Sequence, residues 1–360
     1  MFSLPTELPE LCRRAREKRD ARSRRVITYS PKVFLPITNL CRNRCEYCAF
    51  RRSPGDPGVW TMSPDEVTTT LDRGRTLRCT EALLCLGDTP ETAFPSHRAT
   101  LAAFGFEDTV GYLDACSRWA LSHKLLPHTN AGILSAAQMD RLAETNVSLG
   151  LMLETTSERL CQSGGPHARA PDKRPALRLR MLAEAGELKI PFTTGALVGI
   201  GETFEEYLET ITAIAGLHAR FGHIQEVIIQ PFRAHAGTRM AVAPEPDLTT
   251  LKRAIATARL MLPEDVSVQT PPNLSAGDVV DLLDAGADDL GGISPLTRDY
   301  INPEFAWPHL TDLSRSLEDR GYALRPRLPV TSRQRANVRA SLEPFLVQAQ
   351  ASLDLGVVPA

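Results

Sequence analysis

The sequence predicts an α/β fold, a barrel of the TIM type with six to eight βα units that is complete or partly open. Short apolar runs alternate with amphipathic stretches from about residue 30 onward. Helical patterns separate these runs, which is typical of parallel strands. Polar residues follow six successive apolar runs, where such a barrel carries its chemistry, at the carboxyl ends of its strands.

The expected elements follow in chain order. Eight apolar runs are expected to form strands, of which the last two are the shortest patterns: 33–37, 81–86, 125–129, 147–153, 190–198, 224–230, 266–269 and a short run near 289–290. Helices are expected between them, for example over 204–221 and 248–262. Ser63, Pro64 and Glu66 form a capping-box pattern that predicts the start of the first barrel helix.

Length and composition indicate one catalytic domain with two short flanks. The 360 residues carry a formal net charge of −2, so no basic excess favours nucleic acid, and no apolar run approaches the ~20 residues of a membrane span. We expect an N-terminal basic helix over 1–27, a barrel domain over 28–304 and a C-terminal helical tail over 305–360 that packs on the barrel. The N-terminal arginines lack interleaved aromatic residues, so we interpret them as a solvated helix face.

Three cysteines after the first strand form the most informative motif. Cys41, Cys45 and Cys48 have the spacing C-x3-C-x2-C, with Tyr47 just before the last one. Three thiolates on one short loop suit three irons of a [4Fe–4S] cluster, which needs four ligands in all. The fourth iron would then be open to an outside ligand.

Zinc and a disulfide are the alternatives for this loop. Structural zinc takes four ligands, usually from paired C-x2-C or histidine units, and the nearest downstream histidine is His97. Disulfides are rare in reducing compartments, and the N-terminus lacks the apolar segment of a secretory signal. We therefore expect a cytoplasmic protein with a cluster, and we interpret the other five cysteines as buried apolar residues.

These residues resemble the radical S-adenosylmethionine (SAM) superfamily, whose signature is the same cysteine loop after the first strand. The resemblance implies a [4Fe–4S] cluster on Cys41, Cys45 and Cys48, with the amine and carboxylate of SAM on the fourth iron. It also implies further SAM contacts. These are Tyr47, Gly87, Asp88, Glu154, Gly195, Gly199, Gly201 and either Arg178 or Arg180, of which we select Arg178.

A narrower resemblance covers about residues 28–310. Strings such as Pro127-His128-Thr129-Asn130 and Lys189-Ile190-Pro191-Phe192-Thr193-Thr194-Gly195 are similar to 7,8-didemethyl-8-hydroxy-5-deazariboflavin synthases, the first subunit of FO synthase. The resemblance implies a lyase of the ammonia-lyase type in coenzyme F-420 biosynthesis. It would cyclise an adduct of hydroxybenzyl and ribityliminouracil with loss of ammonia. The sister subunit, which joins tyrosine to 5-amino-6-ribitylaminouracil, and a non-catalytic iron–sulfur protein are the alternatives.

The proposed reaction needs proton transfers and polar contacts to the substrate. Histidine titrates near neutral pH, so we select His128 as the candidate base, although a purely structural histidine is an equal alternative. Four polar residues near strand ends are expected to contact substrate: Asn130, Thr194, Gln230 and Asn273. The expected partners are the second FO synthase subunit and an electron donor such as ferredoxin or flavodoxin, with no nucleic acid and no membrane.

Overall fold

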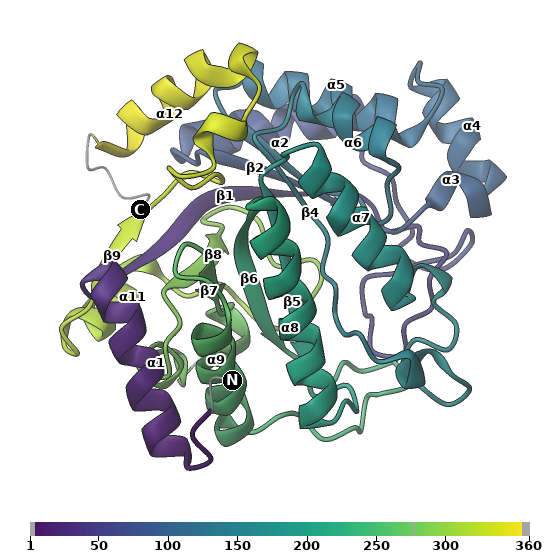
Figure 1. The fold of residues 1–360 in the computed structure, drawn as a ribbon. Helices are drawn as coiled ribbons and strands as arrows, with labels where there is room; N and C mark the ends of the chain where they lie inside the picture. Colours follow the sequence, from purple (N-terminus) through teal and green to yellow (C-terminus); the bar gives the residue numbers. More distant parts are fainter. Residues whose placement is uncertain (1–3, 276, 355–360) are drawn as a thin grey trace.

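Eight parallel strands close into a barrel in the computed structural model, which describes residues 4–275 and 277–354 (Figure 1). The strands are β1 (Val26–Thr38), β2 (Glu81–Leu86), β3 (Leu126–Asn130), β4 (Ser148–Gly150), β5 (Phe192–Val198), β6 (Ile224–Pro231), β7 (Ser267–Gln269) and β8 (Asp289–Ile293). Each pairs with the next in the chain, and β1 pairs with both β8 and β2. The predicted barrel is therefore confirmed, and it is complete.

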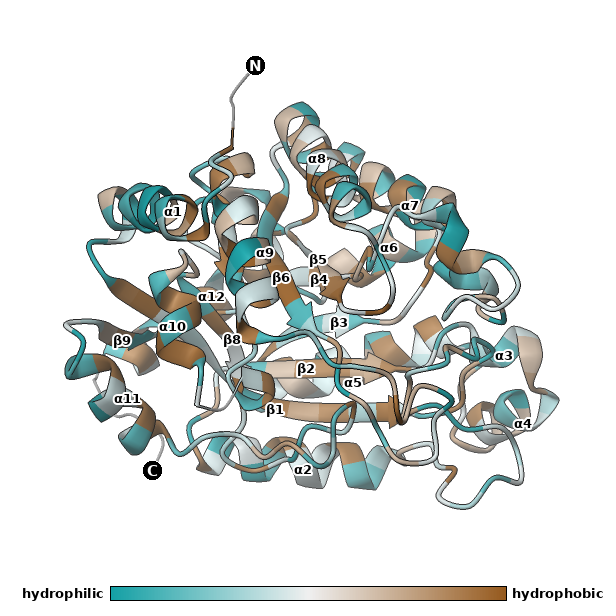
Figure 2. Ribbon diagram, turned by 90° about the horizontal axis from the view of Figure 1, so that it is seen from below, coloured by the Kyte–Doolittle hydropathy of each residue, from teal (hydrophilic) through white to brown (hydrophobic). Residues whose placement is uncertain are grey.

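Helices between the strands form the outer layer of the barrel. They are α2 (Pro64–Thr76), α3 (Pro90–Ala93), α4 (Pro95–Ala103), α5 (Thr109–Ser122), α6 (Ala136–Ala143), α7 (Pro175–Glu187), α8 (Phe204–Phe221), α9 (Leu248–Met261) and α10 (Val279–Asp284). The predicted capping box is present, because the side chains and backbone of Ser63 and Glu66 bond reciprocally at the start of α2. The strands are mostly apolar, and the helices carry many polar residues (Figure 2).

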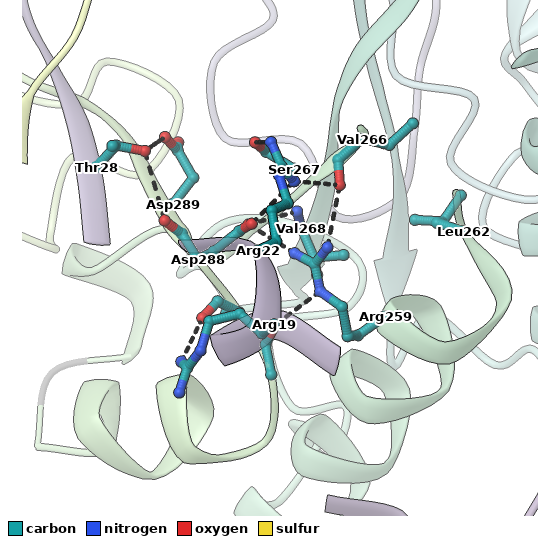
Figure 3. Close-up of polar contacts among 12 residues, drawn as sticks. Arg19, Arg22, Thr28, Arg259, Leu262, Val266, Ser267, Val268, Asp288 and Asp289 are labelled. Carbon is teal, nitrogen blue, oxygen red and sulfur yellow. Dashed lines mark hydrogen bonds and ion pairs between the residues drawn. The ribbon is translucent and has the colours of Figure 1, made fainter. Parts of the chain in front are cut away.

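The N-terminal helix α1 (Leu8–Ser23) packs against the barrel beside α9 (Figure 1). Its charged face is only partly solvated, which corrects the sequence interpretation. Arg19 is fully buried, and its guanidinium donates to the carbonyls of Leu283 and Ala287 at 2.7 and 2.9 Å. Arg22 pairs with Asp288 at 3.1 Å, beside Arg259 of α9 (Figure 3). A buried guanidinium needs such partners, so these arginines dock the helix.

The C-terminal segment contains a strand that the sequence analysis did not predict. Between α11 (Leu310–Glu318) and α12 (Glu343–Asp354), β9 (Ala323–Pro326) pairs with the first residues of β1. This partner explains why β1 starts at Val26, well before the predicted residue 33. The expected helical tail is thus mixed in structure. The domain boundaries at residues 27 and 304 stay a prediction.

The chain after β9 covers the amino-terminal end of the barrel. The carbonyl of Pro329 accepts hydrogen bonds from Ser148 of β4 and Gln225 of β6, at 2.8 and 3.0 Å. Leu346 of α12 packs with Leu126 and Leu328 in a small separate core. This end of the barrel is closed, and the opposite end carries the cysteine loop. Within the described ranges, none of the helices has the length and apolar character that a membrane span requires.

Candidate active site

The cysteine loop lies at the carboxyl end of β1 and is held by backbone contacts. The amides of Arg44 and Glu46 donate to the carbonyls of Arg169 and Pro166, at 2.9 and 3.0 Å. The amide of Cys48 donates to the carbonyl of Cys45 at 3.2 Å, which forms a turn within the motif. The cysteines are therefore positioned by a second loop, which follows β4, as well as by β1.

Gly87 and Asp88, after β2, form the opposite wall of the cysteine loop. A Cβ on Gly87 would lie 2.0 Å from the Leu40 carbonyl oxygen and 2.6 Å from Cβ of Cys41, so only glycine fits here. The Asp88 amide donates to Sγ of Cys41 at 3.1 Å. Its carboxylate accepts from Asn43 and from the amide of Ile133. These contacts fix the first cysteine against the β2 turn.

The donor set fits a cluster better than a single metal ion. In the part of the chain that the structure describes, no three His, Cys, Asp or Glu side chains converge on a single-ion position. In a [4Fe–4S] cluster each thiolate binds a different iron, so the sulfurs lie further apart than around one zinc ion. Burial raises the pKa of Cys41 to about 12, so this thiol loses its proton only with a cation beside it.

A cavity opens beneath the cysteine loop and collects most of the predicted site residues. They come from the ends of several strands and face one another across the barrel mouth. The predicted residues in its lining are Cys41, Cys45, Tyr47, Cys48, Gly87, Asp88, Asn130, Glu154, Arg178 and Gln230. Apolar side chains such as Met152, Leu197 and Phe232 line the cavity between these polar groups.

Glu154 lies on one side of this cavity in a left-handed conformation, with φ of 68°. It forms an ion pair with Lys173. Burial opposes ionisation of Glu154, but Lys173 and Arg178 outweigh that cost and hold its pKa below the usual value. Glu154 is therefore an ionised carboxylate that faces the site.

Arg178, at the first turns of α7, is the arginine that reaches the site. It is buried, donates to the carbonyls of Asp172 and Met152, and lies 3.5 Å from the Asp88 carboxylate. Arg180 is exposed on the outer face of the helix and pairs with Glu184 at 3.7 Å. The geometry supports the choice of Arg178 over Arg180.

Tyr47 is locked in place by a histidine of the loop after β4. Its hydroxyl lies 2.9 Å from Nε2 of His167, and the two rings meet edge to face with centroids 5.6 Å apart. Burial lowers the pKa of His167 to about 3, so this ring is neutral. The contact explains why an aromatic residue within the motif has one fixed orientation.

His128 lies deeper in the barrel than its predicted position at a strand end suggested. It lines a second cavity in the barrel interior, and burial lowers its pKa to about 4. The Ser148 hydroxyl donates to Pro329, so it accepts from Nδ1–H of His128 at 2.6 Å. The ring is therefore neutral with Nε2 unprotonated, but its lowered pKa makes it a weaker base than the near-neutral histidine that the sequence analysis expected.

The other predicted residues lie around or away from the cavities. Asn273 lines an interior cavity and donates to Asp299 at 2.9 Å. Strand alternation places Thr193, rather than Thr194, in the lining of the interior cavity. The Thr194 hydroxyl accepts from the amide of Leu153. Gly195, Gly199 and Gly201 are not in the cavity lining, although Leu197 between them is.

The sequence analysis missed several polar residues of the site. Asn43, within the motif, bridges Asp88 and the backbone of Asp172. Lys173 pairs with Glu154. Lys32, Glu81 and Glu226 line the lumen from within apolar strands. The available signal for this last group was a charged residue inside a run that otherwise reads as a buried strand.

The family model of the radical SAM superfamily matches residues 35–214 of the chain. The 7,8-didemethyl-8-hydroxy-5-deazariboflavin synthase of Methanopyrus kandleri is 48% identical over 306 residues, covering 85% of this chain and 91% of that protein. A similar match, 44% over 304 residues, is the synthase of the same name from Methanothermobacter thermautotrophicus. The chain belongs to this family of radical SAM proteins.

A longer relative has a different chain organisation. The FO synthase of Mycobacterium tuberculosis is 45% identical over 339 residues, which is 89% of this chain but 40% of that protein. Among solved structures, the FeFe-hydrogenase maturase of Carboxydothermus hydrogenoformans has a TM-score of 0.72 at 19% identity, covering 97% of this chain and 82% of its own. Methylornithine synthase has a TM-score of 0.68 at 18% identity, covering 94% and 92%. These likenesses confirm the fold.

Membership of the superfamily implies a [4Fe–4S] cluster and SAM as cofactors. The glycine turn that leaves room for Cys41, the buried thiols and the ionised Glu154 fit such a pair of groups. Cys41, Cys45 and Cys48 would hold the cluster. Gly87, Asp88, Glu154 and Arg178 line the same cavity as these cysteines.

Proposed function

We propose that the chain cyclises a hydroxybenzyl–ribityliminouracil adduct to 7,8-didemethyl-8-hydroxy-5-deazariboflavin, with loss of ammonia, as a lyase in coenzyme F-420 biosynthesis. One observation carries the proposal beyond family membership. The cavity beneath the cysteine loop adjoins two interior cavities, one of which shares Asn130 and Met152 with it and the other Gln230. A substrate can therefore extend from the cofactor position into the barrel, shielded from water.

The bound cofactors would supply a carbon-centred radical that removes a hydrogen atom from the substrate. The protein's own residues provide orientation and exclusion of water. Met152, Leu197 and Phe232 make the upper cavity apolar, which suits an aromatic group next to the cofactor. His128 offers an unprotonated Nε2 in the lumen as a hydrogen-bond acceptor for the substrate.

Two partners belong to this proposal. The adduct would come from the second FO synthase subunit, and the 60% of the Mycobacterium tuberculosis protein that this chain does not match has room for such a unit. The electron donor would be an acidic protein such as ferredoxin or flavodoxin. Five arginines surround the outer face of the cysteine loop: Arg44, Arg51, Arg52, Arg169 and Arg239. Donor affinity should fall as salt screens these charges.

The reaction is tested with anaerobically reconstituted enzyme, SAM, a reductant and the adduct formed by the sister subunit. Deazaflavin fluorescence, 5′-deoxyadenosine and ammonia should appear together. If the purified chain makes adduct from tyrosine and 5-amino-6-ribitylaminouracil alone, it is the sister activity instead. Absence of 5′-deoxyadenosine under all conditions would identify a non-catalytic iron–sulfur protein.

The cluster assignment is tested separately by iron and sulfide counts. Changing Cys41, Cys45 or Cys48 to Ala should remove most of the cluster, while Cys12→Ala should keep it, because Cys12 lies on α1. A cluster that survives any of the three motif changes would contradict the assignment.

A further inference from the structure

The floor of the barrel lumen holds a lysine and a glutamate that interact through their charges but form no direct hydrogen bond or ion pair in the described ranges. Lys32 of β1 and Glu81 of β2 occupy register-matched positions on neighbouring strands. Both are more than nine-tenths buried and both line the interior cavity. Within residues 4–275 and 277–354, neither charged group has a hydrogen bond or an ion pair. A buried charge without a partner is costly for folding.

The barrel wall is shaped to admit these polar side chains. A Cβ on Gly292 would lie 2.1 Å from Cδ of Lys32 and 2.7 Å from its Nζ. A Cβ on Gly291 would overlap the Gln269 amide nitrogen at 1.7 Å, and one on Gly150 would lie 2.9 Å from Nε2 of His128. Three glycines thus leave space for the side chains of Lys32, Gln269 and His128, which line one cavity.

The lumen also has a polarity gradient along the strands. Lys32 lies six residues, or about 20 Å, before the end of β1, and the cysteine loop follows that end. In the upper cavity Met152, Leu197 and Phe232 form an apolar part of the wall beside the polar groups near the cysteine loop, whereas Glu81, His128, Gln269 and Lys32 surround the floor. An elongated ligand with one aromatic end and one polar end would fit in only one direction.

We propose that Lys32 and Glu81 bind the pyrimidinedione ring of the substrate at the barrel floor and so direct its hydroxybenzyl end toward the cysteine loop. This inference rests on the proposed function. The ring carries an imide N–H next to carbonyl oxygens, and the two side chains offer an acceptor beside a donor. The Gln269 amide, whose Oε1 has no partner and which lines the same cavity, adds a further acceptor.

The charged residues at the barrel floor differ in their partners, and this difference separates ligand binding from folding. Arg327 and Asp289, which also lie at this end of the barrel, bind each other and serve the structure. Lys32 contacts the rings of Phe34 and Trp307 at 5.4 and 4.9 Å from the centroids, and Glu81 and Asp299 act on it only through longer-range charge interactions. Removing a structural charge lowers stability, whereas removing an unpaired buried charge leaves stability equal or higher.

The test measures equilibrium binding of the fluorescent product, 7,8-didemethyl-8-hydroxy-5-deazariboflavin, to cluster-loaded enzyme with SAM and without reductant. Lys32→Met and Glu81→Gln should each weaken binding at least tenfold, with iron content unchanged and a melting temperature no lower than that of the parent protein. Lys252→Met, on the outer side of α9, is the matched control and should bind as the parent does.

A second ligand identifies which part of the molecule is bound. A product analogue methylated at the imide nitrogen should bind weakly to the parent protein. Glu81→Gln should reduce the affinity for this analogue only slightly further. If both variants bind product as tightly as the parent, or if the effect of Glu81→Gln is as large for the methylated analogue, the inference is overturned. If the parent neither binds nor forms product, the proposed function fails as a whole.

Discussion

At the scale of single residues, the site depends on charges whose ionisation is set by their neighbours. Glu154 is buried in the mouth cavity, yet Lys173 and Arg178 keep its pKa below the usual value. Its left-handed backbone, φ of 68°, is uncommon for a residue with a side chain and turns the carboxylate toward the cavity. A left-handed conformation at a residue other than glycine costs conformational energy, and such costs are often found at functional sites.

We therefore expect Glu154→Gln to weaken SAM binding on the order of tenfold, because a charge-assisted hydrogen bond is replaced by a neutral one. Equilibrium dialysis with the cluster-loaded protein measures the effect, and the iron count should stay at the parent value. Glu158→Gln is the control, since Glu158 lies on the same loop but is exposed. Equal SAM affinity in the Glu154 and Glu158 variants would remove Glu154 from the proposed contacts.

At the scale of elements, the cysteine loop is built where β1, the turn after β2 and the loop after β4 meet. The close approach of Gly87 to Leu40 and Cys41 is the tightest of these contacts. The turn after β2 contacts the loop through the backbone of Gly87, and the Asp88 amide donates a hydrogen bond to the Cys41 sulfur at 3.1 Å. The position of the first cysteine thus depends on a residue that has no side chain.

Gly87→Ala should displace the cysteine loop and reduce bound iron and sulfide, because its Cβ would overlap the Leu40 carbonyl at 2.0 Å. The measurement is the iron and sulfide content after anaerobic reconstitution, with circular dichroism to verify that the barrel is folded. Gly216→Ala on α8, where nothing lies within 4 Å of the added atom, should retain the full cluster. A full cluster in the Gly87 variant would show that the turn adapts.

At the scale of the whole molecule, the barrel and the cysteine loop could be predicted because their signals are local. Alternating apolar and amphipathic segments identified all eight strands, and β2 was located at its observed bounds. The sequence could not reveal β9, since a four-residue strand with half-exposed side chains lacks a periodic signal. β4 is shorter than predicted, because only Ser148–Gly150 forms regular pairs although the apolar run continues to Leu153.

The interior of the barrel was the part that sequence reasoning could not resolve. The choice between Thr193 and Thr194 depends on which face of β5 turns inward, and a strand that is buried on both faces has no polar–apolar alternation to decide it. Lys32, Glu81 and Glu226 stand far apart in the chain and meet only when the barrel closes. Such a cluster follows from strand register, which a single sequence does not show.

Buried histidines give the whole molecule a dependence on pH. Burial lowers the pKa of His128 and His223 to about 4, against about 6.5 in an unfolded chain. Between these values the unfolded state binds more protons, so stability falls as the pH falls from about 6.5 to 4. Burial raises the pKa of Glu226 to about 7, so this group acts in the opposite direction. Its contribution to stability is lost as the pH rises. A variant comparison separates the two effects.

His223 is suited to that comparison, because it is fully buried between Phe192 and Phe221 and lies outside the site. Between pH 6.5 and 5, one histidine with so low a folded pKa costs about 2 kcal/mol of unfolding free energy. Urea unfolding of the cluster-free protein measures how far the unfolding free energy drops between pH 7 and pH 5. This drop should be smaller by about 2 kcal/mol in His223→Leu than in the parent protein. His309→Leu, at an exposed position, should keep the parent's loss. Identical losses in the His223 variant and the parent would mean that this ring is not the group that titrates.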